Sequence, residues 1–383
     1  MLINYQINPK FKPFVLIADI LGYTLVHPIL SLKRFNKAKI RSILIIRIDE
    51  IGDVVLTTPI FRALKEEFPN SKIDVLVKEG TKELLKHNPN VNNRITCEKE
   101  WLRNKLNFPY FLSLAKKLKN NNYDLIIDLH TSPLNIFFAF LIGGYKIGYA
   151  FRGFGFLLNK TKFTAKKEHI INRNLNLLKL ININHKNKKM EVFYSKKEET
   201  YINTLLKEHK LTGKKLICIN PGTLRTNKLW QNSKWAELSD ILIEKYNVHI
   251  LFTGSSNEKP LINSITSQTK NKGKTINFAG KTNLLQLATL IKKCKLLISP
   301  DTGPLHIARA VETPLIGLYG STNPYIWGYN EDKYKTIYKK LDCSFCNRGY
   351  CKKKGEEKYQ CMSSIKVKDV VKEVRRLDSI TQR

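Results

Sequence analysis

The sequence predicts an α/β protein built on two doubly wound parallel sheets. Apolar runs such as residues 43–46 (ILII) and 216–220 (LICIN) have the length and composition of strands that are buried on both faces. Segments of helical length separate such runs in both halves of the chain, as crossover helices do in parallel sheets. The length of 383 residues is sufficient for two domains of ordinary size, each with its own core.

Composition limits the class of protein. A hydrophobic content of 42% is that of a globular chain. The formal net charge of +34 has two readings: lysine spread over solvated faces, or attraction to an anionic membrane or nucleic acid. Most of the seven cysteines are crowded near the C-terminus and do not form a secreted disulfide framework, so a reducing cytoplasm is the expected location.

Residues 1–40 form a separate N-terminal segment. Residues 11–30 are apolar, but Asp19, Gly22 and Pro28 interrupt them, so the run falls short of a spanning helix. Basic residues follow at positions 33, 34, 37 and 39. The expected structure is a short helix that either lies in the membrane interface or packs on the domain.

The first domain is expected over residues 41–195. Its predicted strands are residues 43–46, 72–77, 124–129 and an edge strand at 145–149; its predicted helices begin at Thr57 and cover 81–87, 111–119, 134–142 and 168–180, with a loop at 150–170. The first strand runs into a turn centred on Gly52-Asp53. Because ligands sit at the carboxyl ends of such strands, the acids of this turn (Asp49, Glu50 and Asp53) are candidate site residues.

The second domain is expected over residues 196–365, followed by a C-terminal helix within 366–383. Its predicted strands are residues 216–220, 249–252, 276–279, 296–300 and 314–319; its predicted helices are 196–209, 284–293, one from Pro304 and 367–377. The turn after residues 216–220 combines Gly222, Thr223 and Thr226 with Arg225 and Lys228. Free backbone N–H groups, hydroxyls and fixed cations are the parts of a pyrophosphate site.

Two further strand ends carry polar residues. Glu258 could accept hydrogen bonds from a ribose, or it could begin its helix favourably beside the helix dipole. Asp301 and Thr302 precede a helix and could cap it, but a strand-end Asp-Thr-Gly with Gly303 at a helix start also suits a phosphate. His306, in the first turns of that helix, is either a structural histidine or a donor contact.

The Cys-rich segment, residues 343–361, leaves two readings open. Cys343, Cys346, Cys351 and Cys361 include one CxxC pair and could bind zinc tetrahedrally. Their other spacings are irregular, which favours paired or buried thiols and no metal.

These motifs, taken in order, resemble glycosyltransferase family 9, the ADP-heptose:lipopolysaccharide heptosyltransferases. The similarity runs from about residue 41 to 374. The matching stretches are IRIDEIGDVVLTTP at 46–59, NPGTLRTNKLW at 220–230, GSSNE at 254–258, SPDTGPLHIA at 299–308, YGSTNP at 319–324 and the CSFC…CM pattern of the tail.

The resemblance implies a GT-B fold, with two Rossmann-like domains facing across a cleft and a C-terminal helix that crosses back to the first. It implies inverting, metal-independent transfer of heptose from ADP-heptose to the lipopolysaccharide core, with no cofactor. By motif position, Asp53 matches the general base. The donor contacts by the same criterion are Thr223 and Lys228 at phosphate, Glu258 at the ribose, Asp301 near the sugar, and Thr302 and Gly303 in the phosphate loop. Lys281 stands where some members have a methionine near the adenine, which leaves the nucleotide open.

The implied partners are a nucleotide-sugar donor, an anionic glycolipid acceptor (lipid A–Kdo or core) and a membrane surface, with no nucleic acid. The implied location is the inner face of the cytoplasmic membrane, peripherally bound. Three alternatives stay open: a family member that uses another nucleotide sugar on an O-antigen or other glycolipid, a basic nucleic-acid-binding protein, and a non-catalytic membrane-associated scaffold.

Overall fold

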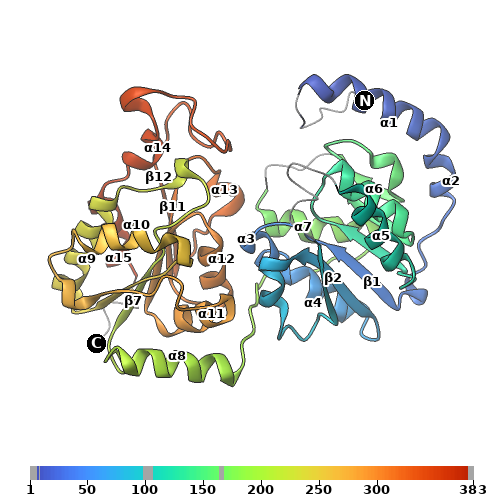
Figure 1. The fold of residues 1–383 in the computed structure, drawn as a ribbon. Coiled ribbons are helices and arrows are strands. Elements are labelled where there is room, and N and C mark those ends of the chain that lie inside the picture. Colours follow the sequence, from blue (N-terminus) through green and yellow to red (C-terminus); the bar gives the residue numbers. More distant parts are fainter. Residues whose placement is uncertain (1–6, 8, 98–106, 164–167, 378–383) are drawn as a thin grey trace. The chain divides into compact units, whose positions relative to one another are not determined.

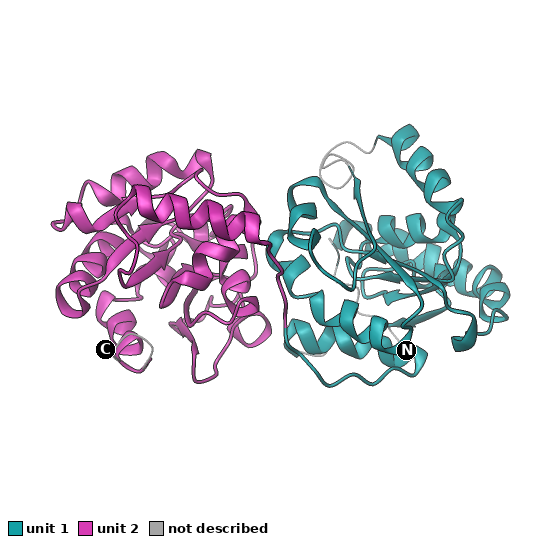
Figure 2. Ribbon diagram, turned by 90° about the horizontal axis from the view of Figure 1, so that it is seen from below, with its two compact units in different colours: residues 1–189 teal, residues 190–383 magenta. Residues whose placement is uncertain are grey.

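The computed structural model describes residues 7, 9–97, 107–163 and 168–377. The chain divides into two compact units, residues 1–189 and 190–383 (Figure 2). Each unit contains one six-stranded sheet whose paired strands are all parallel, with helices packed around it (Figure 1). The predicted α/β class with doubly wound sheets is therefore confirmed.

The first sheet has the strand order β3-β2-β1-β4-β5-β6. Its strands are β1 (Ser42–Ile46), β2 (Lys72–Lys78), β3 (Asn93–Cys97), β4 (Leu125–Asp128), β5 (Tyr145–Tyr149) and β6 (Lys160–Lys162). The helices of this unit are α1 (Lys12–Leu25), α2 (His27–Ser31), α3 (Ile51–Val55), α4 (Thr58–Glu67), α5 (Phe108–Lys119), α6 (Pro133–Ile142) and α7 (Ile170–Leu178). Four residues of β1 are completely buried, as a central strand covered on both faces requires.

Helices α5 and α6 pack together over one face of this sheet. Phe111 of α5 and Phe138 of α6 meet edge to face, with ring centroids 5.1 Å apart, above Leu44 and Ile126 of the central strands. The alternation of side chains along a strand sends Ile43 and Ile45 to the opposite face. Both faces are apolar and buried, which explains why the run ILII shows no polar alternation.

The second sheet repeats this order as β9-β8-β7-β10-β11-β12. Its strands are β7 (Leu216–Ile219), β8 (His249–Phe252), β9 (Thr275–Asn277), β10 (Leu296–Pro300), β11 (Leu315–Tyr319) and β12 (Tyr334–Tyr338). The helices of this unit are α8 (Lys196–Glu208), α9 (Asn232–Tyr246), α10 (Lys259–Thr266), α11 (Leu284–Lys293), α12 (Gly303–Ala310), α13 (Pro324–Trp327), α14 (Gln360–Ser363) and α15 (Val367–Arg375).

The structure corrects the predictions for the first unit at three places. The 3-10 helix Glu79–Leu85 replaces the helix expected at 81–87. Strand β5 is not an edge strand, because β6 pairs with it inside the stretch expected to be a loop. The turn expected around Gly52-Asp53 is the short helix α3, and Asp53 lies in its first turn.

The C-terminal helix α15 packs in the second unit. Its apolar side chains Val370, Val371 and Val374 are buried in the core that α9 and the second sheet form. The resemblance implied that this helix crosses back to the first unit. Its described residues pack against α9 in the core of their own unit, and the crossing stays a prediction.

Candidate active site

The sites predicted at strand ends coincide with the two topological switch points. In each sheet the strand order reverses beside the first strand, between β1 and β4 in one unit and between β7 and β10 in the other. Ligands of doubly wound proteins bind outside the carboxyl ends of strands at such a point. Asp53 follows β1, Thr223 and Lys228 follow β7, and Asp301 follows β10. Each unit therefore carries a candidate site, here called its half-site, at its own switch point.

Arg47 organises the half-site of the first unit. Its guanidinium is 3% exposed, and its Nη1 donates to the carbonyl oxygen of Leu129 at 2.6 Å. Its Nη2 lies 3.1 Å from Asp53 Oδ1, while its Nε donates to the Asp53 carbonyl oxygen at 3.2 Å. Arg47 thus holds Asp53 by one contact with its carboxylate and one with its backbone. The Asp53 side chain remains 23% exposed, so it is held in place and still accessible.

A second carboxylate, Asp49, shares this arginine. Arg47 Nη1 lies 3.2 Å from Asp49 Oδ2, and Nδ1 of His130 lies 2.7 Å from Asp49 Oδ1. Burial alone would raise the pKa of Asp49, but the positive charge of Arg47 and the contact with His130 outweigh it and lower this pKa. Asp49 therefore stays ionised and paired, which suits a supporting role better than proton transfer.

The turn after β4 positions His130. Asp128 accepts hydrogen bonds from the backbone N–H groups of His130 (3.2 Å) and Thr131 (3.1 Å). Thr131 adopts a left-handed conformation with φ of 64°, which is unfavourable for a β-branched residue. Burial raises the pKa of Asp128 to about 6. The turn is thus held in a strained shape beside the switch point.

In the second unit, the loop that follows β7 is anchored at several points. Trp230 is buried edge to face against Trp235, and its Nε1 donates to the carbonyl oxygen of Ile365 at 2.9 Å. Asn227 Nδ2 donates to the carbonyl oxygen of Arg348 at 2.8 Å, which ties the loop to the Cys-rich segment. These contacts fix the backbone on both sides of Lys228.

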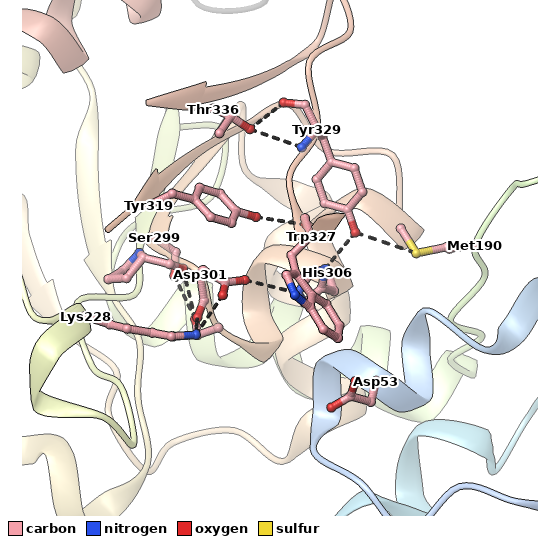
Figure 3. Close-up of polar contacts among 12 residues, drawn as sticks. Asp53, Met190, Lys228, Ser299, Asp301, His306, Tyr319, Trp327, Tyr329 and Thr336 are labelled. Carbon is pink, nitrogen blue, oxygen red and sulfur yellow. Dashed lines mark hydrogen bonds and ion pairs between the residues drawn. The ribbon is translucent and has the colours of Figure 1, made fainter. Parts of the chain in front are cut away.

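Lys228 forms the centre of a buried polar cluster. Its Nζ donates to Oδ2 of Asp301 at 2.7 Å and to the Asp301 carbonyl oxygen at 2.9 Å. His306 Nε2 lies 3.5 Å from the other carboxylate oxygen of Asp301. Burial would raise the pKa of Asp301, but the contact with His306 and the charge of Lys228 hold it well below its ordinary value. Figure 3 shows these three side chains converging.

Two buried tyrosines, Tyr319 and Tyr329, lie next to this polar cluster. The Tyr329 hydroxyl lies 2.7 Å from His306 Nδ1 and donates to Met190 Sδ at 3.8 Å, as Figure 3 shows. The Tyr319 hydroxyl donates to the carbonyl oxygen of Trp327 at 3.0 Å. Burial is the main cause that raises the pKa of both hydroxyls, so they remain neutral. Neither tyrosine was a predicted site residue.

The Asp-Thr-Gly turn leads into helix α12, which begins at Gly303. The side chain of Thr302 does not cap the helix. Its Oγ1 lies 2.9 Å from Ser299 Oγ and donates to the carbonyl oxygen of Pro300 at 3.3 Å. The capping alternative is therefore wrong for Thr302, and the N-terminus of α12 keeps the partial positive charge that favours an anion.

Glu258 lies beside Gly222, at the ends of neighbouring strands β8 and β7. The Ser255 N–H donates to Glu258 Oε2 at 2.6 Å in a capping box of the 3-10 turn Ser256–Glu258, which leads directly into α10, so Glu258 has the structural role at a helix start that the sequence allowed. A Cβ at Gly222 would lie 1.8 Å from Glu258 Oε1, which explains why glycine occupies this position. Thr223, next in the chain, accepts a hydrogen bond from the Arg225 N–H through its Oγ1 at 3.2 Å.

The Cys-rich segment carries free thiols in this structure. Cys343 and Cys346 are exposed, and Cys351 and Cys361 are partly buried. Within the described part of the chain, no group of three or more His, Cys, Asp or Glu side chains is arranged to hold a metal ion. Burial and the neighbouring thiols raise the pKa of Cys361 to about 11. The zinc alternative gains no support from this geometry.

Arg47 and His130 were not among the predicted site residues. A signal existed for Arg47, because an arginine directly after four buried apolar residues must find partners at the strand end. His130 lies two residues after the end of β4. Its pairing with Asp49 depends on the parallel register of β1 and β4, which brings residues 82 positions apart to the same edge.

The comparisons with known proteins agree with these observations. Residues 111–357 match the family model described as glycosyltransferase family 9 (heptosyltransferase). Lipopolysaccharide heptosyltransferase 3 of Escherichia coli K12 is 31% identical over 289 residues, which cover 72% of this chain and 81% of that protein.

Solved structures share the fold. The family 9 glycosyl transferase of Veillonella parvula matches with a TM-score of 0.75 and 24% identity over 88% of this chain and 97% of its own. E. coli ADP-heptose LPS heptosyltransferase II matches with a TM-score of 0.71 and 22% identity, covering 88% and 98% of the two chains. From its motifs, its two switch-point sites and these matches, the chain belongs to glycosyltransferase family 9, the heptosyltransferase family.

Proposed function

We propose that this glycosyltransferase moves heptose from ADP-heptose to a sugar of the lipopolysaccharide core, by a single inverting displacement that needs no metal ion. The observation that carries the proposal is the pair of half-sites at equivalent switch points. One unit holds the accessible, oriented carboxylate of Asp53, and the other holds the Lys228 ammonium group, paired with Asp301, and the N-terminus of α12. The curated relative and the solved neighbour, both named as heptosyltransferases, support heptose and ADP as the transferred sugar and the nucleotide.

The reaction needs two kinds of residue. An acceptor hydroxyl attacks the anomeric carbon, its proton passes to a base, and the bond from that carbon to the diphosphate oxygen breaks with inversion. Asp53 is the proposed base, because Arg47 orients its carboxylate and leaves it accessible. The departing ADP takes up the electron pair of the broken bond and needs nearby positive charge.

The second unit is the proposed donor-binding half. Lys228 and the N-terminus of α12, with Thr302 and Gly303, would bind the diphosphate, and Thr223 would contact it from the loop after β7. Asp301 holds Lys228 in position. We propose that Asp301 also lies beside the donor sugar. Glu258 would accept hydrogen bonds from the ribose, and His306 would support Asp301 from the other side.

The decisive experiment is a donor and acceptor assay with the purified chain. We expect ADP-heptose, rather than nucleotide sugars of other bases or hexoses, to raise the thermal unfolding temperature and to support transfer to a core acceptor that lacks the terminal heptose. Nuclear magnetic resonance of the product would show an inverted anomeric centre. Stabilisation by a different nucleotide sugar would favour the alternative in which a family member transfers another sugar to another glycolipid. Lys281, which stands where some family members have a methionine near the adenine, leaves this alternative open.

Removal of metal ions is expected to leave transfer intact. The positive charge proposed for the donor site comes from Lys228 and the N-terminus of α12. Dialysis against EDTA should therefore change the rate of transfer by less than about twofold. Initial rates before and after dialysis, with Mg²⁺, Zn²⁺ or Fe²⁺ added back, provide the measurement. A large loss that one of these ions restores would contradict metal-independent transfer.

Two substitutions of Glu258 separate its two roles. Glutamine at N3 can keep the capping box, whereas alanine loses it at a cost of about 1 kcal/mol of stability. If the carboxylate binds ribose, Glu258→Gln should weaken ADP binding by about tenfold or more. Calorimetric titration with ADP and thermal unfolding test both variants. Normal ADP affinity in Glu258→Gln would restrict this residue to capping.

The proposed location is the inner face of the cytoplasmic membrane, where a lipid-anchored core acceptor would be presented. Over the described residues, no helix is both long and apolar enough to cross a bilayer. Peripheral attachment is therefore the form of membrane contact that we propose.

A further inference from the structure

Helices α1 and α2, which precede the first strand, present an unusual apolar surface. Of the fifteen large apolar side chains that are exposed among the described residues, nine lie between positions 11 and 32. We call five of them, one helical turn apart, the apolar face: Phe14, Ile17, Leu21, Leu25 and Ile29. Their exposed fractions range from 54% to 69%.

The opposite side of α1 is firmly seated on the first unit. Asp19 is buried and its Oδ1 accepts a hydrogen bond from the Phe154 N–H at 2.7 Å. A Cβ at Gly22 would lie 2.2 Å from the ring of Phe156, so helix and ring are in close contact. Beyond α1, Asn159 Nδ2 donates to the carbonyl oxygen of Leu30 at 2.8 Å. The apolar face is therefore held outward by the packing of the opposite side.

Charge is arranged around this face in a particular way. Among residues 13–32, Asp19 is the one Asp, Glu, Lys or Arg, and it is buried. Lys10 and Lys12 precede the stretch, and Lys33, Arg34, Lys37 and Lys39 follow it. An apolar helix face bounded by cations is complementary to the surface of an anionic bilayer, with acyl chains below and headgroup phosphates around it.

The helix is too short to span a membrane. Its 14 residues extend about 21 Å, against about 30 Å for a hydrocarbon core. A second copy of the chain would be a poorer occupant of the face, because pairing would bring the cationic ends of two copies together without acids to offset them. We propose that α1 and α2 dock the protein flat on an anionic membrane, with the apolar face inserted among the acyl chains and the flanking cations against the headgroups. The inference rests on the peripheral location proposed above and names the element and the lipid charge that provide it.

The test uses the full chain and vesicles that contain no acceptor. We expect it to co-sediment with phosphatidylcholine vesicles that contain about 30% phosphatidylglycerol, and to bind pure phosphatidylcholine about tenfold or more weakly. The triple variant Phe14→Ser/Ile17→Ser/Leu21→Ser should lose about a hundredfold in partitioning to the anionic vesicles. The double variant Lys33→Gln/Arg34→Gln should lose about tenfold, and the remaining binding should depend less on salt.

Matched controls remove similar groups elsewhere. Phe108→Ser deletes an exposed aromatic side chain of α5, and Lys196→Gln/Lys197→Gln removes two exposed cations at the start of α8. Both control variants should bind vesicles as the parent chain does. Circular dichroism and transfer to a water-soluble core oligosaccharide would show that the triple variant is folded and active.

Three results would overturn the docking proposal: no binding of the parent chain to anionic vesicles, equal binding of the parent and the triple variant, or a dimer in sedimentation that the triple variant abolishes without a change in vesicle binding. Loss of vesicle binding with transfer to the soluble oligosaccharide retained would support it. Vesicle binding through α1 by a chain that transfers no sugar would refute the proposed reaction and leave the docking surface standing.

Discussion

Asp53→Ala is expected to lower the transfer rate by about two to four orders of magnitude, the range of general-base catalysis, while donor binding stays near normal. Donor binding should persist because Asp53 belongs to the first unit, whereas the residues proposed to bind ADP belong to the second. The measurements are kcat in the transfer assay and the Kd for ADP by calorimetric titration.

A neighbouring acid provides the matched control. Glu50 directly precedes α3, three positions before Asp53, and its Oε1 pairs with Lys78 Nζ at 2.7 Å. Glu50→Gln should therefore leave kcat within about threefold of the parent, since exposed ion pairs contribute little. Near-normal turnover in Asp53→Ala would remove this residue from the base role. Asp49, held ionised by Arg47 and His130, would then be the next carboxylate to substitute.

Lys228→Met is the second large expected effect, with transfer lowered by about two to three orders of magnitude and ADP binding weakened as well. The ammonium group is the one charged side chain proposed to contact the leaving diphosphate. Its loss also leaves the buried Asp301 carboxylate without its ion-pair partner, and breaking such a pair destabilises a fold by about 3–5 kcal/mol.

Stability and catalysis are separated by a double variant. Lys228→Met/Asp301→Asn removes both charges, so it should unfold at a higher temperature than Lys228→Met and remain inactive. Lys292→Met, which removes a lysine that donates to the Val311 carbonyl oxygen at 2.8 Å in the same unit, serves as control and should keep full activity. Recovery of transfer in the double variant would show that Lys228 acts only through stability.

Much of the fold was predictable because its central strands are buried on both faces. Runs such as 43–46 and 216–219 are continuous and apolar, a pattern typical of short strands that are buried on both faces. The site was predictable for the same reason: parallel strands of a doubly wound sheet deliver their carboxyl ends to one edge, so polar residues after the strands identify it. The sequence by itself thus determined the α/β class, the order of the main elements and the strand ends that carry Asp53, Lys228 and Asp301.

The tertiary structure alone decided the sheet edges and the partners of the site residues. β6 (Lys160–Lys162) and β12 (Tyr334–Tyr338) have little or no apolar run, because each pairs with one neighbour and leaves its other side unpaired. His130 meets Asp49, and Glu258 meets Gly222, only once strands distant in sequence are aligned. Local patterns reveal whether a segment is buried, whereas which segments become neighbours depends on packing between residues far apart in the chain.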